Sequence, residues 1–429
     1  MDVVIRNPFE PTSIGGLGNR PVFFENLDGL RALCFLVVFF YHGFYTEFDR
    51  LSNSPIYQFI KFDIFGNGNL GVNFFFVLSG FLITFLLIKE REEHGSIRIA
   101  HFWFRRILRI WPLFFCCVIF GFIAFPMLKR MMGSASVETA DPLYYITFLN
   151  NFDMLYNGMP DASVLAVLWS IAVEEQFYLI WPVALSVVPI RFYPYFFGSV
   201  IAGTLIFRSI HLNSPESGHI FEIHTLSCIG DMTIGAWGAY LALKGKAVQW
   251  FRQLPRASIL MVYLLFILIF FFRDEILFEN SFLRVVERSF IAVVILCIIL
   301  EQNYSDRSIF KLVRSRTLSG LGRISYGLYC LHFVGILITL TLTKILGWNE
   351  DLWQVMILET ALALALTIVL AQISHRVLER PFLKLKSRYA IIRSGADHGV
   401  AVPGPEKFGQ ESPMDQIMVR ERSTSINSG

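Results

Sequence analysis

The chain has 429 residues, of which 54% are hydrophobic, 15% aromatic and 17% charged. Soluble domains carry about 45–50% apolar and about 25% charged residues, and here the apolar residues form runs such as GVNFFFVLSGFLITFLLI (71–88), so the composition predicts a protein that crosses a membrane several times. The net charge of +3 is too small to indicate nucleic-acid binding, and the six cysteines form no CxxC pair, so we expect neither a disulfide framework nor a metal site.

Ten apolar segments are long enough to cross a hydrocarbon core of about 30 Å as helices. In chain order they are 30–45, 70–88, 110–128, 168–188, 192–212, 223–243, 257–272, 285–300, 324–343 and 354–374. Backbone groups cannot stay unpaired in lipid, so segments of this length must be helical. The sequence therefore predicts an all-α integral membrane protein, a bundle of about ten transmembrane helices.

The connecting segments predict how the chain is oriented in the membrane. Alternate connections hold 18 basic residues in one set and 7 in the other, the richer set being 1–29, 89–109, 189–191, 244–256 and 301–323. Lys and Arg accumulate on the cytoplasmic side. We therefore expect a multi-pass protein of the cytoplasmic membrane with both termini in the cytoplasm.

The two ends of the chain look different from its middle. No basic stretch leads into an apolar core at the start, so we expect no cleavable signal peptide. Residues 1–25 are predicted to form a cytoplasmic N-terminal segment and 26–386 the membrane domain. The tail, 387–429, is polar and rich in Gly, Pro and Ser, which is typical of disorder.

The first predicted span carries Arg31 and His42, eleven residues apart. At about 100° per residue the two side chains share one helix face, about 16 Å apart along the axis. Arg31 is thus expected near the cytoplasmic end and His42 in the outer half. An ionisable residue within a span is costly and predicts a functional site; the alternative for His42 is a polar residue that bonds a neighbouring helix.

The fourth predicted span, LWSIAVEEQFYLIWP, places Ser170, Glu174 and Tyr178 in one stripe. Helix rise puts Glu174 about 9 Å, His42 about 12 Å and Ser79 about 13 Å below the outer surface. A carboxylate beside an imidazole fixes its tautomer and raises its basicity. We therefore expect Glu174 to orient His42, and its neighbour Glu175 to face the lipid headgroups.

Three arginines precede the third predicted span. Arg106 and Arg109 share a helix face, with Arg105 one turn from Arg109. Guanidinium groups match phosphate oxygens in bidentate geometry, which predicts a phosphate clamp at the cytoplasmic mouth. The alternative is an anchor to anionic lipids.

Four motifs in this order resemble those of acyltransferase family 3, integral-membrane enzymes that O-acylate sugars and other hydroxylated acceptors. They are Arg31-(ten residues)-His42, FFFVLSGF (74–81), FRRILRI (104–110) and WSIAVEEQFYL (169–179). Weaker similarities follow at GDMTIGAWGAYLA (230–242), ISYGLYCLH (324–332) and ERPF (379–382). The resemblance covers roughly residues 26 to 386.

The resemblance implies a reaction in which no cofactor is bound and acyl-CoA, most simply acetyl-CoA, is a co-substrate. Its phosphates would be held by Arg106 and Arg109, with Arg31 further in. His42, oriented by Glu174, would act as general base or as acyl carrier, and Ser79 would steady the oxyanion. The acceptor would be a carbohydrate or another hydroxylated molecule.

Other residues of these motifs are expected to support the site. Trp169, Ser170 and Tyr178 belong to the fourth motif; Tyr326 and His332, together with Tyr329, would line the donor path, although a histidine merely satisfied within the bundle is an equal alternative for His332. A transporter also fits ten spans with buried charge, but no two spans are broken by Gly or Pro at matching positions of two halves.

Overall fold

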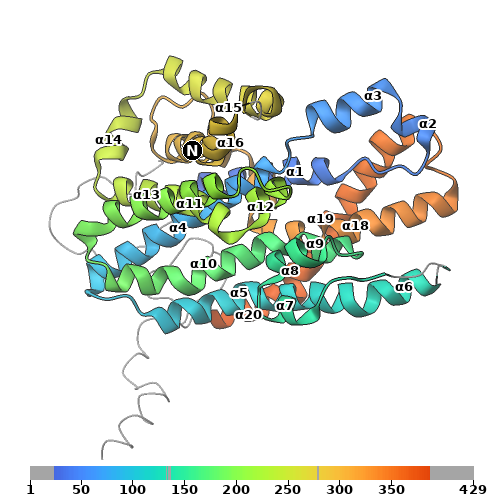
Figure 1. Ribbon diagram of the computed structural model, residues 1–429, viewed down its shortest axis with the longest axis horizontal. Helices are drawn as coiled ribbons and strands as arrows, with labels where there is room; N and C mark the ends of the chain where they lie inside the picture. The colour runs from blue at the N-terminus through green and yellow to red at the C-terminus, as the bar shows by residue number, and fades with distance from the viewer. Residues whose placement is uncertain (1–23, 132, 134–136, 278–279, 387–429) are drawn as a thin grey trace, which may run out of the picture. The chain divides into compact units, whose positions relative to one another are not determined.

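The computed structural model describes residues 24–131, 133, 137–277 and 280–386, and within these ranges the chain is helical and has no strand. Most long helices lie side by side along one common direction (Figure 1). They are α1 (Glu25–His42), α4 (Leu70–His94), α5 (Ile99–Ile119), α10 (Leu168–Val187), α11 (Tyr193–Ile210), α13 (Thr225–Leu243), α15 (Arg256–Leu277), α16 (Ser281–Tyr304), α18 (Ser325–Leu346) and α19 (Thr360–Ser374).

Short helices connect or extend the long ones. The α-helical ones are α2 (Asp49–Ser52), α3 (Pro55–Gln58), α6 (Phe125–Met131), α7 (Pro142–Ile146), α8 (Asn150–Asn157), α9 (Ser163–Ala166), α12 (Ser217–Ile223), α14 (Lys246–Gln253), α17 (Arg316–Arg323) and α20 (Arg380–Lys386). The π-helical ones are η1 (Phe59–Ile64), η2 (Phe120–Ala124), η5 (Gln354–Glu359) and η6 (His375–Glu379), and the 3₁₀-helical ones are η3 (Ile190–Phe192) and η4 (Leu312–Arg314).

Eight helices in the described part of the chain are long and apolar enough to cross a membrane. They correspond to eight of the ten predicted segments, so the prediction of an all-α, multi-pass membrane protein is confirmed. The remaining two segments, 30–45 and 285–300, fall on α1 and α16, whose 18 and 24 residues include several charged side chains. The count of ten spans and the cytoplasmic placement of both termini stay predictions.

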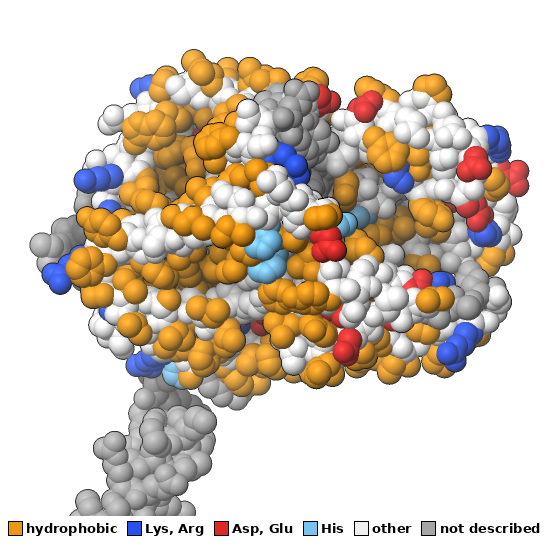
Figure 2. Space-filling model, in the orientation of Figure 1, with side chains coloured by type: hydrophobic (Ala, Val, Ile, Leu, Met, Phe, Trp, Pro, Cys, Tyr) orange, Lys and Arg blue, Asp and Glu red, His pale blue; other side chains and the backbone are white. Residues whose placement is uncertain are grey.

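The surface and the buried helices differ as expected for a lipid environment. Figure 2 shows apolar side chains over much of the middle of the visible face, with charged side chains more frequent toward its two ends. In α4 78% of the most apolar stretch is buried inside the protein, whereas in α15 only 11% is. Helix α4 is therefore central and α15 peripheral.

Helices α4 and α13 pack closely through two glycines. A Cβ atom on Gly80 would lie 1.9 Å from the carbonyl oxygen of Met232, and one on Gly235 would lie 2.0 Å from that of Val77. Small residues let membrane helices approach in this way. The contact fixes Ser79, next to Gly80, in the middle of the bundle.

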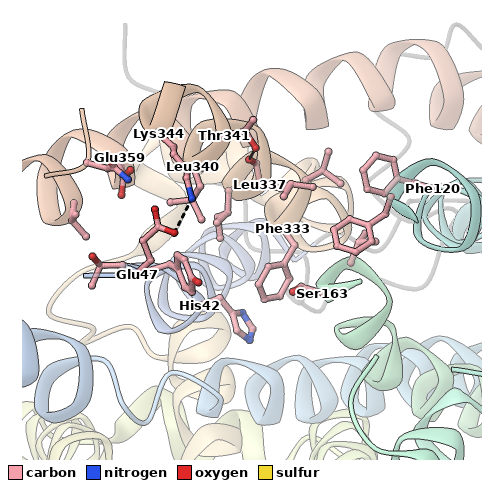
Figure 3. A pocket seen from close by; sticks show the side chains of 18 residues that line it. His42, Glu47, Phe120, Ser163, Phe333, Leu337, Leu340, Thr341, Lys344 and Glu359 are labelled. Carbon is pink, nitrogen blue, oxygen red and sulfur yellow. Dashed lines mark hydrogen bonds and ion pairs between the residues drawn. The ribbon is translucent and has the colours of Figure 1, made fainter. Parts of the chain in front are cut away.

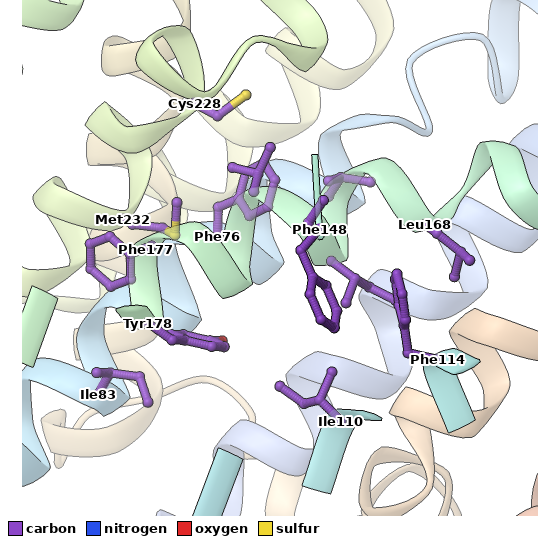
Figure 4. Close-up of a cluster of buried hydrophobic side chains, with 14 of the residues drawn as sticks. Phe76, Ile83, Ile110, Phe114, Phe148, Leu168, Phe177, Tyr178, Cys228 and Met232 are labelled. Carbon is purple, nitrogen blue, oxygen red and sulfur yellow. The ribbon is translucent and has the colours of Figure 1, made fainter. Parts of the chain in front are cut away.

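A large apolar cluster joins α4, α5, α10 and α13 (Figure 4). Its aromatic rings meet closely, with 4.4 Å between the ring centres of Phe114 and Phe148 and 4.5 Å between those of Phe177 and Trp181. Tyr178 belongs to the same cluster and is 4% exposed. The polar residues of α10 are therefore held in place by rigid packing around them.

One predicted boundary was wrong, because α5 begins at Ile99 and not near residue 110. With η2 and α6 it forms an uninterrupted helical stretch of 33 residues to Met131. Arg105, Arg106 and Arg109 thus lie on a helix. The helix tolerates the first two because Arg105 meets Glu90 on α4 and Arg106 meets Tyr178 on α10. The predicted tail, 387–429, and residues 1–23 of the N-terminal segment lie outside the described residues.

Candidate active site

Helix α1 ends at His42, and the side chain of this residue lines a cavity of about 390 Å³ (Figure 3). Ser163, Phe333 and Thr341 also line it, and Glu47 and Lys344 form an ion pair of 2.8 Å there. We call this end of the bundle the His42 end; the predicted topology places it on the side away from the cytoplasm.

The turn that follows His42 is held by polar contacts. Phe44 has a left-handed backbone with φ 57°. Its carbonyl oxygen accepts hydrogen bonds from the Tyr57 hydroxyl and from Lys61 Nζ, the latter at 3.1 Å. Burial lowers the pKa of Lys61 below its ordinary value. These contacts fix the direction in which the chain leaves α1, and so the end of the helix that carries His42.

His42 is hydrogen-bonded to a second histidine, His332 of α18. His42 Nδ1 lies 3.1 Å from His332 Nε2, and His332 Nδ1 lies 2.6 Å from the carbonyl oxygen of Tyr329. A carbonyl oxygen only accepts, so His332 Nδ1 carries the proton and, in the neutral ring, Nε2 accepts from His42 Nδ1. The lone pair of His42 is therefore on Nε2.

Glu174 lies in a different cluster. Its carboxylate accepts hydrogen bonds from the Ser79 hydroxyl at 2.7 Å and the Tyr178 hydroxyl at 2.9 Å, and these two hydroxyl oxygens are 3.1 Å apart. The contact expected between Glu174 and His42 is thus replaced by the contact between His42 and His332. Helix rise predicts depth but not which helices are neighbours, and it is α18 that meets α1 at this level.

Ser170 connects the fourth motif to the histidine pair. Its hydroxyl lies 2.7 Å from that of Tyr329, the residue whose carbonyl oxygen binds His332. Tyr326, one turn earlier on α18, donates to the carbonyl oxygen of Ile110 at 2.7 Å. Tyr329 and His332, which we expected along the donor path, therefore connect α10 to α1.

The expectation for Glu175 was wrong. Its Oε2 accepts a hydrogen bond from Trp111 Nε1 at 3.0 Å, and its Oε1 is buried without a partner. The reason is that α5 packs against α10, so this side chain meets a neighbouring helix instead of the headgroups.

The predicted arginine cluster assembles around Tyr178. The Arg106 guanidinium lies 5.0 Å from the centre of the Tyr178 ring, and its charge interacts with that of Glu174. The charge of Arg109 acts on those of both Arg106 and Arg31, and Arg31 is paired with Asp28 at 2.7 Å. Arg105 is different, because it lies 3.6 Å from Glu90.

Comparison with known proteins agrees with the four motifs. A family model described as an acyltransferase domain, that of acyltransferase family 3, matches residues 24–376. This chain belongs to that family. The resemblance recognised from the motifs is thereby confirmed.

One relative is the peptidoglycan O-acetyltransferase OatA of Listeria monocytogenes. It is 25% identical to this acyltransferase-family chain over 376 residues, which make up 84% of this chain and 56% of the relative. A protein of Staphylococcus aureus (strain COL) named “Putative O-acetyltransferase” is 27% identical over 380 residues, 84% of this chain and 58% of the relative. The chain therefore matches little more than half the length of these relatives. No solved structure is significantly similar to it.

Sequence reasoning missed a second group of buried charged residues at the His42 end. They are Arg208 on α11, Asp231 on α13, Arg273 on α15, and Glu287 and Arg288 on α16. Four of the five lie within predicted spans, so the rule that an ionisable residue in a span is costly would have singled them out. Their pairing across four helices has no signature in the sequence.

Proposed function

We propose that this member of the acyltransferase family is an O-acyltransferase. It would move an acyl group, most simply acetyl, from cytoplasmic acyl-CoA to a hydroxyl group of a glycan or other acceptor at the opposite face of the membrane. The observation that supports this most strongly is His42, which lines a cavity and whose Nδ1 is bound to His332. The names of the relatives, one of which acts on peptidoglycan, support a carbohydrate acceptor.

In this reaction His42 Nε2 is the reacting nitrogen. It takes the proton of the acceptor hydroxyl while that oxygen attacks the thioester carbonyl carbon. When the tetrahedral intermediate collapses, the C–S bond breaks and the CoA sulfur receives the proton. If Nε2 instead attacks the thioester, the C–S bond breaks, an acyl-imidazolium forms and CoA leaves as the thiolate. The acceptor hydroxyl then takes the acyl group, and its proton goes to the thiolate. Both routes require the same free nitrogen.

His332 would support either route by holding His42 in one tautomer. When Nε2 gains a proton or an acyl group, the His42 ring becomes positively charged. The hydrogen bond from its Nδ1 to His332 Nε2 then becomes charge-assisted, and such bonds are stronger than neutral ones. His332 is fully buried, so its ring has no water to pair with instead.

Arg31, Arg106 and Arg109 would bind the phosphates of the donor. The planar, positively charged guanidinium groups suit phosphate oxygens. Glu174, bound to Ser79 and Tyr178, lies beside Arg106 and would position that guanidinium. In this arrangement the Ser79 hydroxyl is engaged by Glu174, so Ser79 would have to rotate before it could steady an oxyanion.

The proposal is tested with purified protein in lipid nanodiscs and acetyl-CoA labelled in its acetyl group. We expect release of CoA and appearance of the label on an added or co-purified glycan. A transporter would leave acetyl-CoA intact while moving a solute across the membrane of proteoliposomes. That pair of results would overturn the proposed function.

A further inference from the structure

A second cavity, of about 720 Å³, opens at the His42 end and shares no lining residue with the first. Its wall is formed by residues of six helices, α4, α10, α11, α12, α15 and α16, and of the segment before α4. They include Asn69, Trp169, Glu222, Arg273 and Arg288. Its volume lies within the range of about 300–1,000 Å³ that is usual for small-molecule sites.

The lining of this cavity is strongly polar but close to electrically neutral. Arg208, Arg273, Arg284 and Arg288 face three glutamates, Glu216, Glu222 and Glu287, with Asp231 behind Arg288. The pairs are close: Arg288 Nε lies 2.7 Å from Asp231, and Glu287 binds both Arg273 and Arg208. Balanced charge with many donors and acceptors favours a neutral, hydroxyl-rich ligand over a polyanion.

One donor in the cavity lacks an acceptor. Arg288 is 7% exposed; its Nη1 donates to the carbonyl oxygens of Phe221 and Glu222, both at 3.2 Å, but its Nη2 is buried without a partner. A buried guanidinium N–H without an acceptor is unfavourable, and such groups in native proteins call for an explanation. Arg288 lines the cavity through other atoms of its side chain, so an oxygen atom of a ligand would complete its hydrogen bonds once the guanidinium turned toward the cavity.

The cavity wall is connected to the histidine pair through consecutive residues. Gly68 packs on the last turn of α1, where a Cβ atom on it would lie 2.3 Å from the Cβ atom of Tyr41, the neighbour of His42. Trp169 in the wall precedes Ser170, whose hydroxyl contacts that of Tyr329. A ligand in this cavity would therefore lie beside the residues that hold His42.

We propose that this cavity binds a sugar ring of the acceptor, an inference that rests on the proposed function. A carbonyl or hydroxyl oxygen of the sugar accepts from Arg288 Nη2. Sugar hydroxyls donate to the carboxylates of Glu216 and Glu222, and the apolar face of the ring packs on Trp169, whose indole is large and rigid. The sugar of the acceptor is thus held by polar groups of both signs, beside the residues that position His42.

The test measures binding of two neutral probes, a β-1,4-linked tetramer of N-acetylglucosamine and maltotetraose, to the full chain in nanodiscs without any acyl donor. We expect at least one of them to bind, and Arg288→Lys and Trp169→Ala each to weaken that binding at least tenfold. Arg256→Lys, the same change at an exposed position at the start of α15, is the control and should bind as the wild type does.

Thermal unfolding of each variant identifies loss of binding that is due to misfolding, and Trp169→Ala keeps the test informative if Arg288→Lys unfolds. Failure of both probes to bind the wild type, or unchanged affinity in both variants, would overturn the inference. So would binding of a polyanion such as heparin in preference to the neutral probes. This binding measurement contains no acyl donor, so its result does not depend on catalysis. Absence of acyl transfer in the acetyl-CoA assay would count against the proposed function alone.

Discussion

His42 Nδ1 lies 3.1 Å from His332 Nε2, and this contact determines which nitrogen of His42 is available for chemistry. Its direction follows from the next contact, in which His332 Nδ1 donates to the carbonyl oxygen of Tyr329 at 2.6 Å. A backbone carbonyl oxygen can accept a hydrogen bond but cannot donate one, so the backbone of α18 sets the tautomers of both rings. An imidazole here takes the orienting role that we expected of Glu174.

The first prediction concerns His332. His332→Phe removes the Nε2 acceptor that faces His42 Nδ1, so the His42 ring is held less firmly in one tautomer and kcat for acyl transfer should fall roughly 10²-fold, the lower end of what general-base catalysis contributes. His332→Gln should recover part of this loss, because its amide oxygen can accept from His42. Steady-state kinetics at saturating acyl-CoA measure both. Equal loss in the two variants, with unchanged thermal stability, would contradict the positioning role.

The second prediction separates the Glu174 cluster from the histidine pair. Glu174→Gln leaves one oxygen acceptor for two hydroxyl donors, and Tyr178→Phe removes one of these donors, so their effects on stability should couple by more than about 0.5 kcal/mol. Glu174→Gln and His332→Gln, in different clusters, should be additive. Thermal or chemical unfolding of the single and double variants measures both cycles. Strong coupling between Glu174 and His332 would show that the two clusters act as one.

The third prediction concerns the donor phosphates. Replacing both Arg106 and Arg109 with Ala should weaken CoA binding at least tenfold, and Lys at both positions should restore it only partly, because an ammonium lacks the guanidinium fork. Arg105→Ala is the matched control, since Arg105 lies beside Glu90 on the same helix. Isothermal titration with CoA measures the affinities. Unchanged affinity in the double variant would leave these arginines as lipid anchors.

The fourth prediction concerns helix packing. Gly235→Ala places a Cβ atom 2.0 Å from the carbonyl oxygen of Val77 and should destabilise the protein by about 1–3 kcal/mol, as overpacking generally does. Gly203→Ala on α11 is the control, because nothing lies within 4 Å of the added atom. Unfolding of both variants under the same conditions compares them. A Gly235→Ala protein as stable as the Gly203→Ala protein would contradict the close α4–α13 contact.

The fifth prediction concerns orientation. Reporter fusions in the segments 89–109 and 301–323 should report the cytoplasm, and a fusion in 129–167 the outside, because the first two are rich in basic residues. Reporter activity on each side of the membrane is the measurement. The same side for 89–109 and 129–167 would contradict the alternation on which the predicted topology depends.

Much of the fold could be predicted because hydropathy and length decide where a membrane helix forms. Helices α1 and α16 are not among the eight that are apolar enough to cross a membrane, for a physical reason: Arg31 and Arg288 are charged residues whose partners lie on the same or another helix. The early start of α5 has the same cause, since Arg105 meets Glu90 on α4 and Arg106 meets Tyr178 on α10. Charged residues lower the mean hydropathy of a helix, so a helix that the bundle buries can be missed or started too late when hydropathy alone is used.

The sequence could predict which site residues lie at a similar height in the bundle, but not which helices bring them into contact. Helix rise correctly grouped Ser79 with Glu174, which are bonded to each other. It could not show that α18 stands next to α1, so the contact between His332 and His42 was missed. Periodicity gives the height of a residue and its face, whereas the order of helices around the bundle depends on packing such as that of Gly80 and Gly235.

The most direct test of the account is single-turnover transfer from labelled acetyl-CoA by the His42→Ala variant, normalised to correctly inserted protein. His94→Ala is the control, because His94 is an exposed residue of α4 whose Nδ1 lies 3.3 Å from the carbonyl oxygen of Glu90 on the same helix. The account predicts that His42→Ala loses nearly all transfer while still binding CoA, and that His94→Ala keeps wild-type activity. Substantial acetyl transfer by His42→Ala would contradict it.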